Sequence, residues 1–249
     1  ALGDRDSDVR TAACQALGSI GDAQAVPHLI RALGDWDSGV CTAACQALGS
    51  IGDAQAVPHL IRALGDWDSG VCTAACQALG SIGDAQAVPH LIRALGDRDS
   101  DVRTAAYQAL VSIGRAAVPA LIEALGHLDS LVRTAAYQAL VSIGGAAVPA
   151  LIEALKHLDS LVRTAARQAL VSIGRAAVPA LIEALKHLDS LVRTAARQAL
   201  VDIGRAAVPA LIEALGHRNS RVRAAACRVL GSIGDIRAHP ALSLWAHAG

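Results

Sequence analysis

Residues 97–125 read DRDSDVRTAAYQALVSIGRAAVPALIEAL, and this stretch decides the fold. Apolar residues recur at helical spacing both before and after Gly114, a pattern that is typical of amphipathic helices. Asp99 is placed to cap the first helix, Gly114 to end it in a left-handed conformation, and Pro119 to stand in the first turn of the second. The stretch therefore predicts a pair of helices.

The same pattern occurs eight times in the 249 residues, with its prolines spaced by 30 or 31 residues. Such periodicity indicates a solenoid in which each repeat contacts mainly its neighbours. We expect an all-α fold, an α-solenoid that coils as a right-handed superhelix of eight tandem two-helix repeats, with residues 1–249 forming a single repeat domain. The expected repeats are residues 4–34, 35–65, 66–96, 97–126, 127–156, 157–186, 187–216 and 217–249. The last departs from the pattern at His239, Ser243 and Trp245, which predicts a degenerate C-terminal cap.

The composition agrees with closely stacked helices. Hydrophobic residues make up 53% of the chain, but only 2% are aromatic and none is Phe. Alanine on a buried helix face lets neighbouring helices approach to about 8 Å, which large aromatic side chains would prevent. We find no apolar run near the roughly 18 residues of a spanning helix and no signal sequence, so we expect a soluble chain without membrane contact.

The motif D-x-D-S-x-V-R-x-A-A-x-x-A-L-x-x-I-G, followed by A-V-P-x-L-I-x-A-L, resembles the short HEAT-like repeats of the phycobilisome-lyase type. It is also similar to artificial consensus HEAT-like repeat proteins, and the resemblance covers nearly the whole chain. Repeats of this kind serve as adaptors, sensors and, less often, enzymes, so the resemblance implies the fold but no single activity. Family enzymes of the deoxyhypusine hydroxylase kind hold iron with His-Glu pairs, and this chain has no His-Glu dipeptide.

The helix after each proline offers a candidate binding surface. In HEAT-like arrays these second helices usually form the concave face, so the resemblance implies that a partner would bind there. The strip carries basic groups in the first three repeats and acidic groups later, and a merely solvated face is an equally open interpretation. The candidate residues are His28, Arg31, His59, Arg62, His90, Arg93, Glu123, Glu153, Glu183 and Glu213.

Two tryptophans, Trp36 and Trp67, occupy the turns that enter the second and third repeats, where other repeats carry Arg or Leu. Tryptophan at a tolerant position is typical of an interface. Packing over the neighbouring turn is the alternative, and we favour it slightly. Both residues are therefore candidate interface aromatics.

The six cysteines follow the repeat. Because equivalent cysteines of stacked repeats are expected to lie too far apart for a disulfide, we expect free thiols. The Arg after Val is expected to order the stack through a ladder to Asp, which Cys41 and Cys72 interrupt. The position of Cys14, Cys45, Cys76 and Cys227 also holds Tyr and Arg elsewhere, so we interpret it as a tolerant helix flank. A four-thiolate zinc site formed by Cys41, Cys45, Cys72 and Cys76 is the sharper alternative. Our prediction is no metal site and no cofactor.

The formal net charge of zero removes any global argument for affinity to nucleic acid or membranes. It nevertheless hides a division, because residues 4–126 carry 14 acidic and 8 basic groups and residues 127–249 carry 8 acidic and 14 basic groups. An acidic end and a basic end favour head-to-tail self-association. Arginines gather on first helices near the C-terminal end, but nucleic acid is not the favoured partner.

These observations predict a non-catalytic scaffold that binds a protein or peptide along its second helices. The alternative is a scaffold or sensor segment of a larger or self-associating protein, and a more distant one is a bilin lyase or a nucleic-acid-binding enzyme on the same fold. Free cysteines and the lack of a signal sequence favour a cytoplasmic location. Neither catalytic residues nor the identity of the partner follow from the sequence.

Overall fold

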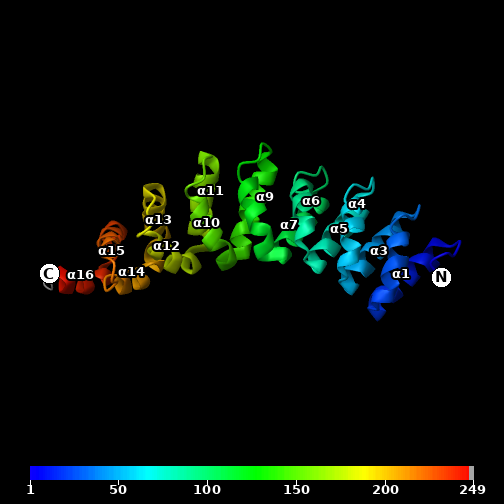
Figure 1. Cartoon of the computed structure of the whole chain (residues 1–249), viewed down its shortest axis with the longest axis horizontal. Coiled ribbons are helices and arrows are strands. Elements are labelled where there is room, and N and C mark those ends of the chain that lie inside the picture. Colours follow the sequence, from blue (N-terminus) through cyan, green and yellow to red (C-terminus); the bar gives the residue numbers. More distant parts are fainter. Residues whose placement is uncertain (247–249) are drawn as a thin grey trace. The chain divides into compact units, whose positions relative to one another are not determined.

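A computed structural model of the chain describes the backbone of residues 1–246, and this part contains helices and turns but no strand. Its helices form two compact units, unit 1 from Ala1 to Ala139 and unit 2 from Leu140 to Gly249. Each repeat contributes a long first helix, a short 3-10 turn and a short second helix, whose succession can be followed in Figure 1. The expected all-α repeat architecture is confirmed, whereas the 3-10 turns are an addition to the prediction. Of the expected cap residues, Trp245 lies outside the described side chains.

Unit 1 holds the first four repeats and most of the fifth first helix. Its first helices are α1 (Ser7–Ile20), α3 (Ser38–Ile51), α5 (Ser69–Ile82), α7 (Ser100–Ile113) and α9 (Ser130–Ile143), the last of which extends into unit 2. Its second helices are α2 (Val26–Ala32), α4 (Val57–Ala63), α6 (Val88–Ala94) and α8 (Val118–Ala124). The turns that precede them are η1 (Ala23–Ala25), η2 (Ala54–Ala56), η3 (Ala85–Ala87) and η4 (Gly114–Ala117).

Unit 2 continues the same order. Its first helices are α11 (Ser160–Ile173), α13 (Ser190–Ile203) and α15 (Ser220–Ile233). Its second helices are α10 (Val148–Ala154), α12 (Val178–Ala184), α14 (Val208–Ala214) and α16 (His239–Ala246). The 3-10 turns are η5 (Gly144–Ala147), η6 (Gly174–Ala177), η7 (Gly204–Ala206) and η8 (Ile236–Ala238).

Helix boundaries follow the chemistry expected from the sequence. The carboxylate of Asp37, for example, accepts hydrogen bonds from the backbone N–H groups of Gly39 and Val40 and so caps α3. Pro58 stands in the first turn of α4, where its missing N–H has no acceptor to lose. All eight glycines that end the first helices have positive φ, between 65° and 76°. The predicted caps and breaks are confirmed.

Those eight glycines nevertheless end their helices in two ways. Gly21 is left-handed, with φ 73° and ψ 14°, and Asp22 then caps the 3-10 turn. Gly114 has φ 66° and ψ −126°, a region open essentially to glycine alone, and begins the 3-10 turn itself. The first ending uses one more residue, which accounts for the repeats of 31 and of 30 residues.

Close stacking of first helices in unit 1 depends on glycine. A Cβ atom placed on Gly49 would lie 2.8 Å from the Cα atom of Ala78 on the next first helix, and Gly18 and Gly80 meet their neighbours in the same way. The backbone of each glycine therefore packs directly on the alanine of the next first helix, with no room for even a methyl group. This contact joins α1, α3, α5 and α7, whose order along unit 1 can be followed in Figure 1.

Valine replaces that glycine in the fourth to seventh repeats, as in Val111 and Val201. Where the valine is present, open grooves lie between consecutive first helices, between α7 and α9 in unit 1 and between α11, α13 and α15 in unit 2. This difference corrects our interpretation of the cysteine flank as tolerant. Cys14, Cys45 and Cys76 are fully buried in the close stack, whereas Arg197 at the same repeat position is exposed.

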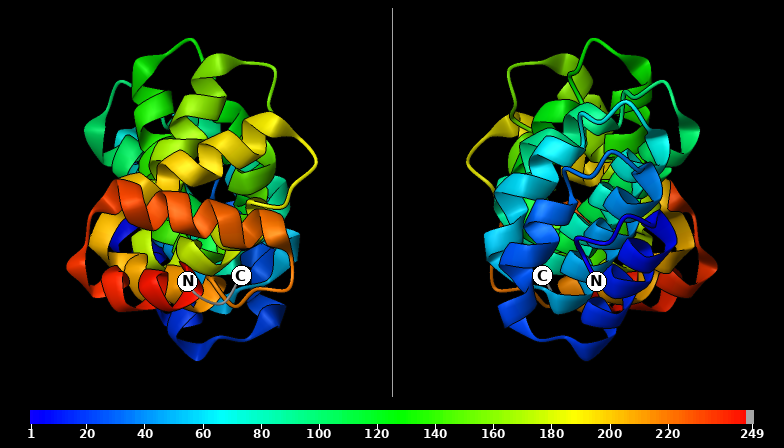
Figure 2. Two further views of the ribbon diagram at one scale, coloured as in Figure 1. Left: turned by 90° about the vertical axis from the view of Figure 1, so that its left-hand side faces the viewer. Right: turned by 90° about the vertical axis from the view of Figure 1, so that its right-hand side faces the viewer.

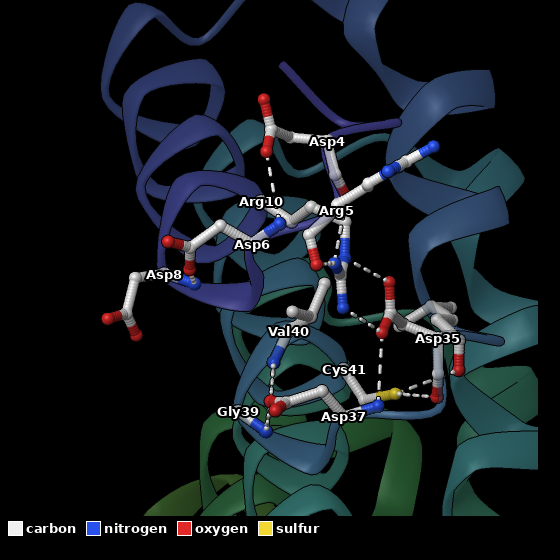
Figure 3. A network of polar contacts seen from close by, with 11 residues as sticks. Asp4, Arg5, Asp6, Asp8, Arg10, Asp35, Asp37, Gly39, Val40 and Cys41 are labelled. Atoms are coloured by element: carbon white, nitrogen blue, oxygen red, sulfur yellow. Dashed lines mark hydrogen bonds and ion pairs between the residues drawn. The ribbon is translucent and has the colours of Figure 1, made fainter.

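A polar network joins the first two repeats (Figure 3). Arg10 donates from Nε and from a terminal nitrogen to the two carboxylate oxygens of Asp35, at 2.8 and 2.9 Å. Its other terminal nitrogen, Nη1, donates to the carbonyl oxygens of Asp4 and Arg5 in its own turn. The guanidinium thus lowers the pKa of the Asp35 carboxyl, chiefly through the hydrogen bond. One rung of the expected ladder therefore exists.

Elsewhere the arginine works mainly within its own turn. Arg193, for instance, donates from Nη1 to the carbonyl oxygens of His187 and Leu188. The thiol of Cys41 takes over part of this role, because it donates to the carbonyl oxygens of Leu33 and Asp35 at 3.4 and 3.1 Å. Cysteine therefore substitutes for arginine in the turn itself, while its short side chain cannot reach the next repeat.

The repeated histidines of unit 2 have a structural role that the sequence did not reveal. In His187, Nδ1 accepts a hydrogen bond of 3.0 Å from the backbone N–H of Asp189. Asp97, at the same repeat position in unit 1, accepts the corresponding bond from Asp99 at 2.8 Å. The imidazole therefore replaces a carboxylate as the acceptor that shapes the turn.

Two stretches, Ser100–Ala124 and Ser130–Ala154, are long and apolar enough by length and composition to cross a membrane. This finding corrects the expectation that no such run exists. In each stretch a positive-φ glycine and a 3-10 turn separate two helices, at Gly114 in the first and at Gly144 in the second. Two such stretches are by themselves weak evidence for a membrane span; 44% and 33% of their most apolar windows are buried inside the fold.

Candidate partner-binding grooves

An open groove lies between α13 and α15 in unit 2. It has a volume of about 430 Å³, with Leu185 and Ala225 at its buried base. Four arginines line it and no acidic residue does. These arginines are Arg193, Arg197, Arg221 and Arg228.

The arginines of this groove differ in what holds them. Arg193 is half-buried and anchored to its own turn through Nη1. Arg197, Arg221 and Arg228 are exposed, and none of the ion pairs found among the described residues involves them. Three guanidinium groups, each with several donors, thus face one groove and are available to an anionic ligand.

A second groove of about 340 Å³ lies between α11 and α13. It too contains arginines, but Arg167 forms an ion pair with Asp202. Leu191 lines this groove and is 55% exposed, and Leu188 in the preceding turn is 90% exposed. Unit 2 therefore presents apolar side chains beside the basic groups.

The exposed leucines around these grooves are an addition to the residues predicted from the sequence. Each of three consecutive repeats has one in the turn and one in the first turn of the first helix. They are Leu128, Leu131, Leu158, Leu161, Leu188 and Leu191. The signal was present in the repeated His-Leu-Asp-Ser-Leu motif, in which both leucines lie off the buried helix face.

The predicted basic strip of the second helices is partly assembled in unit 1. Arg62, His90 and Arg93 line one groove of about 190 Å³ between α4 and α6, together with Asp97. A nitrogen of Arg93 lies 3.2 Å from His90 Nδ1. Next to α2, His28 and Arg31 line a separate groove of about 350 Å³ with Asp35. Of the six basic candidates, His59 lines neither groove.

The acidic candidates on the later second helices are exposed, and Glu153 and Glu183 among them are engaged by nearby cationic groups. Glu153 accepts from Lys156 at 2.6 Å, and this hydrogen bond lowers the pKa of the carboxyl. Glu183 accepts from Lys186 at 2.5 Å and lies 3.3 Å from His217 Nε2, with the same effect on its pKa. Glu123 and Glu213 are exposed at equivalent positions. Local pairing thus reduces the negative character of this strip.

Both candidate tryptophans are exposed, Trp36 to 79% and Trp67 to 86%. Arg10 lies over the Trp36 ring, 5.2 Å from its centroid, so this residue covers one side of the Arg10 guanidinium. A side chain as exposed as Trp67 gains little from packing over its turn. The exposure fits a contact surface for Trp67 and a mixed role for Trp36.

The cysteines are free thiols, of which Cys227 is exposed and the other five are buried. Burial raises the pKa of Cys45 and of Cys76 to about 12, so neither is a thiolate near neutral pH. Among the described residues, no three His, Cys, Asp or Glu side chains are grouped to hold a metal ion. The four-thiolate alternative for Cys41, Cys45, Cys72 and Cys76 therefore does not match this geometry.

Several solved structures are similar to this chain. An engineered protein is 26% identical, with 94% of this chain and 77% of that chain covered and a TM-score of 0.46. The CpcE and CpcF complex of phycocyanin lyase from Nostoc sp. PCC7120 is 25% identical, with 93% and 91% covered and a TM-score of 0.47. Human deoxyhypusine hydroxylase is 25% identical, with 93% and 92% covered and a TM-score of 0.39. No curated protein matches the chain.

Family models match almost the entire sequence. The PBS lyase HEAT-like repeat matches residues 162–187. The model described as HEAT repeats matches residues 1–75, 35–111, 66–141, 110–171 and 178–248. With eight capped helix pairs and these matches, the chain belongs to the HEAT repeat family.

Proposed function

We propose that this protein is a non-catalytic binding scaffold and that it holds an acidic segment of a partner protein in the groove between α13 and α15. The supporting observation is the set of four arginines around a groove without acidic residues. Charge-assisted hydrogen bonds from guanidinium to carboxylate are stronger than neutral ones and can be bidentate. An acidic peptide is therefore the ligand class that this lining favours.

The apolar surroundings favour a peptide over nucleic acid. Leu185 lies at the base of the groove, while Leu188 and Leu191 lie exposed nearby on the same unit. An acidic segment with interspersed apolar side chains satisfies both features. Single-stranded nucleic acid is usually held by aromatic stacking, and the residues that line this groove include no aromatic.

The groove between α4 and α6, which contains part of the predicted basic strip, is the second candidate for the same function. It brings together Arg62, His90 and Arg93, but Asp97 also lines it and opposes an acidic ligand. Its volume, about 190 Å³, is less than half that of the α13–α15 groove. We therefore place the main site on first helices and not on the strip of second helices.

Fluorescence anisotropy with a labelled Glu-Glu-Leu repeat peptide tests the proposal. The double variant Arg221→Ala and Arg228→Ala removes two exposed guanidinium groups whose side chains make no described contact that holds the fold. We expect at least a tenfold loss of affinity, which corresponds to about 1.4 kcal/mol. Affinity of the unmodified chain is expected to fall as salt is raised.

The matched control is the double variant Arg62→Ala and Arg93→Ala, which removes the same charge from the α4–α6 groove. We expect it to change affinity by less than threefold. The reverse order of effects would assign binding to the second helices. Tighter binding of a twelve-nucleotide oligothymidine than of the peptide would overturn the choice of partner class.

A further inference from the structure

The first helix of unit 1 exposes the face that later first helices in this unit bury. Val9 is 40% exposed, whereas Val40 at the same repeat position is fully buried. Ala16 is likewise exposed, although Ala47 is covered by the backbone of Gly18 from the preceding helix. Figure 2 shows this end of unit 1 towards the viewer in its right-hand panel. Helix α1 therefore carries one half of the close stacking contact without the other.

Helix α15 of unit 2 carries the missing half. Cys227 and Gly231 repeat the Cys-x-x-x-Gly spacing of α1, α3 and α5, which the intervening first helices replace with Tyr or Arg and Val. A Cβ on Gly231 would meet no atom within 4 Å, whereas the glycines of α1, α3 and α5 each meet an alanine. Cys227 is exposed, while the three equivalent cysteines of unit 1 are buried. The left-hand panel of Figure 2 shows this end of unit 2.

The polar part of the contact is also divided between these helices. Arg223 donates from Nη1 to the carbonyl oxygens of His217 and Arg218, at 2.9 and 3.1 Å, as Arg10 does in its own turn. In Arg10 the remaining nitrogens bind Asp35 of the next repeat. The residue equivalent to Asp35 in the first repeat is Asp4, which is exposed.

We propose that two copies of this chain associate head to tail, with α15 of one copy stacked on α1 of the next. Gly231 then lies against Ala16, Arg223 binds Asp4, and Cys227 becomes buried. Each of these contacts reproduces one that unit 1 already contains, namely Gly18 on Ala47, Arg10 with Asp35, and the burial of Cys14. The proposal does not depend on the peptide-binding function, because it uses the opposite flank of α15.

Charge supports this pairing. Residues 217–249 contain five basic groups and one acidic group, whereas residues 4–34 contain four acidic and three basic groups. One feature of the internal contact is not reproduced, because Arg5 stands where Trp36 covers Arg10. Since the two surfaces differ, the contact is heterologous and can continue from copy to copy.

Light scattering of the purified chain over a concentration series tests the association. We expect a mass that rises with concentration at low salt, and at least a tenfold weaker association for Gly231→Val. Valine occupies this position in the repeats whose first helices are separated by grooves. On α15 it should be tolerated in the single chain, because no atom lies within 4 Å of a Cβ placed on Gly231. Reaction of Cys227 with a maleimide gives an independent measure, since the thiol should be protected in the associated state of the unmodified chain but not in the variant.

The matched control is Ala224→Val, which enlarges a residue on the flank of α15 that faces the α13–α15 groove. We expect it to leave the association unchanged. A mass equal to that of one chain at every concentration and salt level would overturn the proposal. So would an association that Gly231→Val leaves intact or in which Cys227 reacts freely.

Discussion

At the scale of single residues, the same turn is built with different side chains in different repeats. Arginine or cysteine donates to the turn carbonyls, and aspartate or histidine accepts a backbone N–H. What the repeat preserves is the hydrogen bond and not the residue type. The chemistry of each turn residue is therefore the level at which a substitution is best judged.

Replacing His187 tests this equivalence. His187→Ala removes the acceptor for the Asp189 N–H and should lower the free energy of unfolding by about 1 kcal/mol, since a half-buried donor loses its partner. His187→Asp restores the acceptor found at Asp97 and should be at least as stable as the unmodified chain. Urea unfolding of both variants measures the difference, and equal loss in both would show that the imidazole acts in some other way.

The Arg10–Asp35 pair predicts a pH dependence. Arg10 lowers the pKa of Asp35 below the ordinary value of 3.8. The pair therefore stabilises the fold fully at pH values above the pKa that Asp35 has in the unfolded chain. This stability is lost as the pH falls through the lowered pKa. Asp35→Asn should therefore be less stable than the unmodified chain at pH 7, with a difference that shrinks below about pH 4. A difference that stays constant from pH 7 to pH 3, measured by urea unfolding, would contradict this assignment.

The sequence predicted caps and helix breaks well because each depends on local chemistry. Asp37, Pro58 and Gly52 act within one turn of the chain, so their roles follow from their positions. The acceptor role of His187 could not be predicted in this way. A histidine in a turn is compatible with several structures, and only the fold brings its Nδ1 to the Asp189 N–H.

At the scale of helices, one repeat position decides whether neighbours stack closely or leave a groove. Glycine at 18, 49 and 80 accompanies the close stack, and valine at 111, 171 and 201 accompanies grooves. The sequence displayed this change, but its meaning depends on the distance between helices. For this reason the sequence predicts the group of arginines near the C-terminal end but not the α13–α15 groove that they line.

Gly49→Ala tests the close stack. Alanine normally favours a helix over glycine by up to about 1 kcal/mol. At this position its methyl group would lie 2.8 Å from the Ala78 Cα atom, so the helices must separate. We expect a net destabilisation of about 1 to 3 kcal/mol, as for an overpacked core.

Gly231→Ala is the matched control, because no atom lies within 4 Å of the added methyl group. At concentrations too low for association it should be neutral or more stable than the unmodified chain by up to about 1 kcal/mol. Thermal and urea unfolding of both variants give the comparison. If Gly49→Ala proved more stable than the unmodified chain, glycine at this position would not be required for the close approach of α3 and α5.

At the scale of the whole molecule, the neutral total charge conceals an acidic series of repeats and a basic one. The sequence alone supplied this division, since it needs only a count within each repeat. It could not assign the charges to a function. The fold shows which charges are paired, because Asp35 and Glu183 are engaged within the chain whereas Arg197 and Arg221 face an open groove.

The difference in stacking also predicts uneven stability along the chain. In a repeat protein each element is stabilised mainly by its neighbours, so helices with more buried residues should open less often. Helix α3 buries seven residues, including Cys41 and Cys45, whereas α11 buries four. We expect backbone amides in the middle of α3 and α5 to exchange with deuterium at least about tenfold more slowly than those of α11 and α13. Exchange is measured by mass spectrometry in the unmodified chain and in the Gly49→Ala variant. If the close stack causes the protection, the variant should lose protection in α3 and α5, while exchange in α11 and α13 stays unchanged. Equal exchange in both sets of helices of the unmodified chain would mean that glycine-mediated stacking does not determine where the array opens.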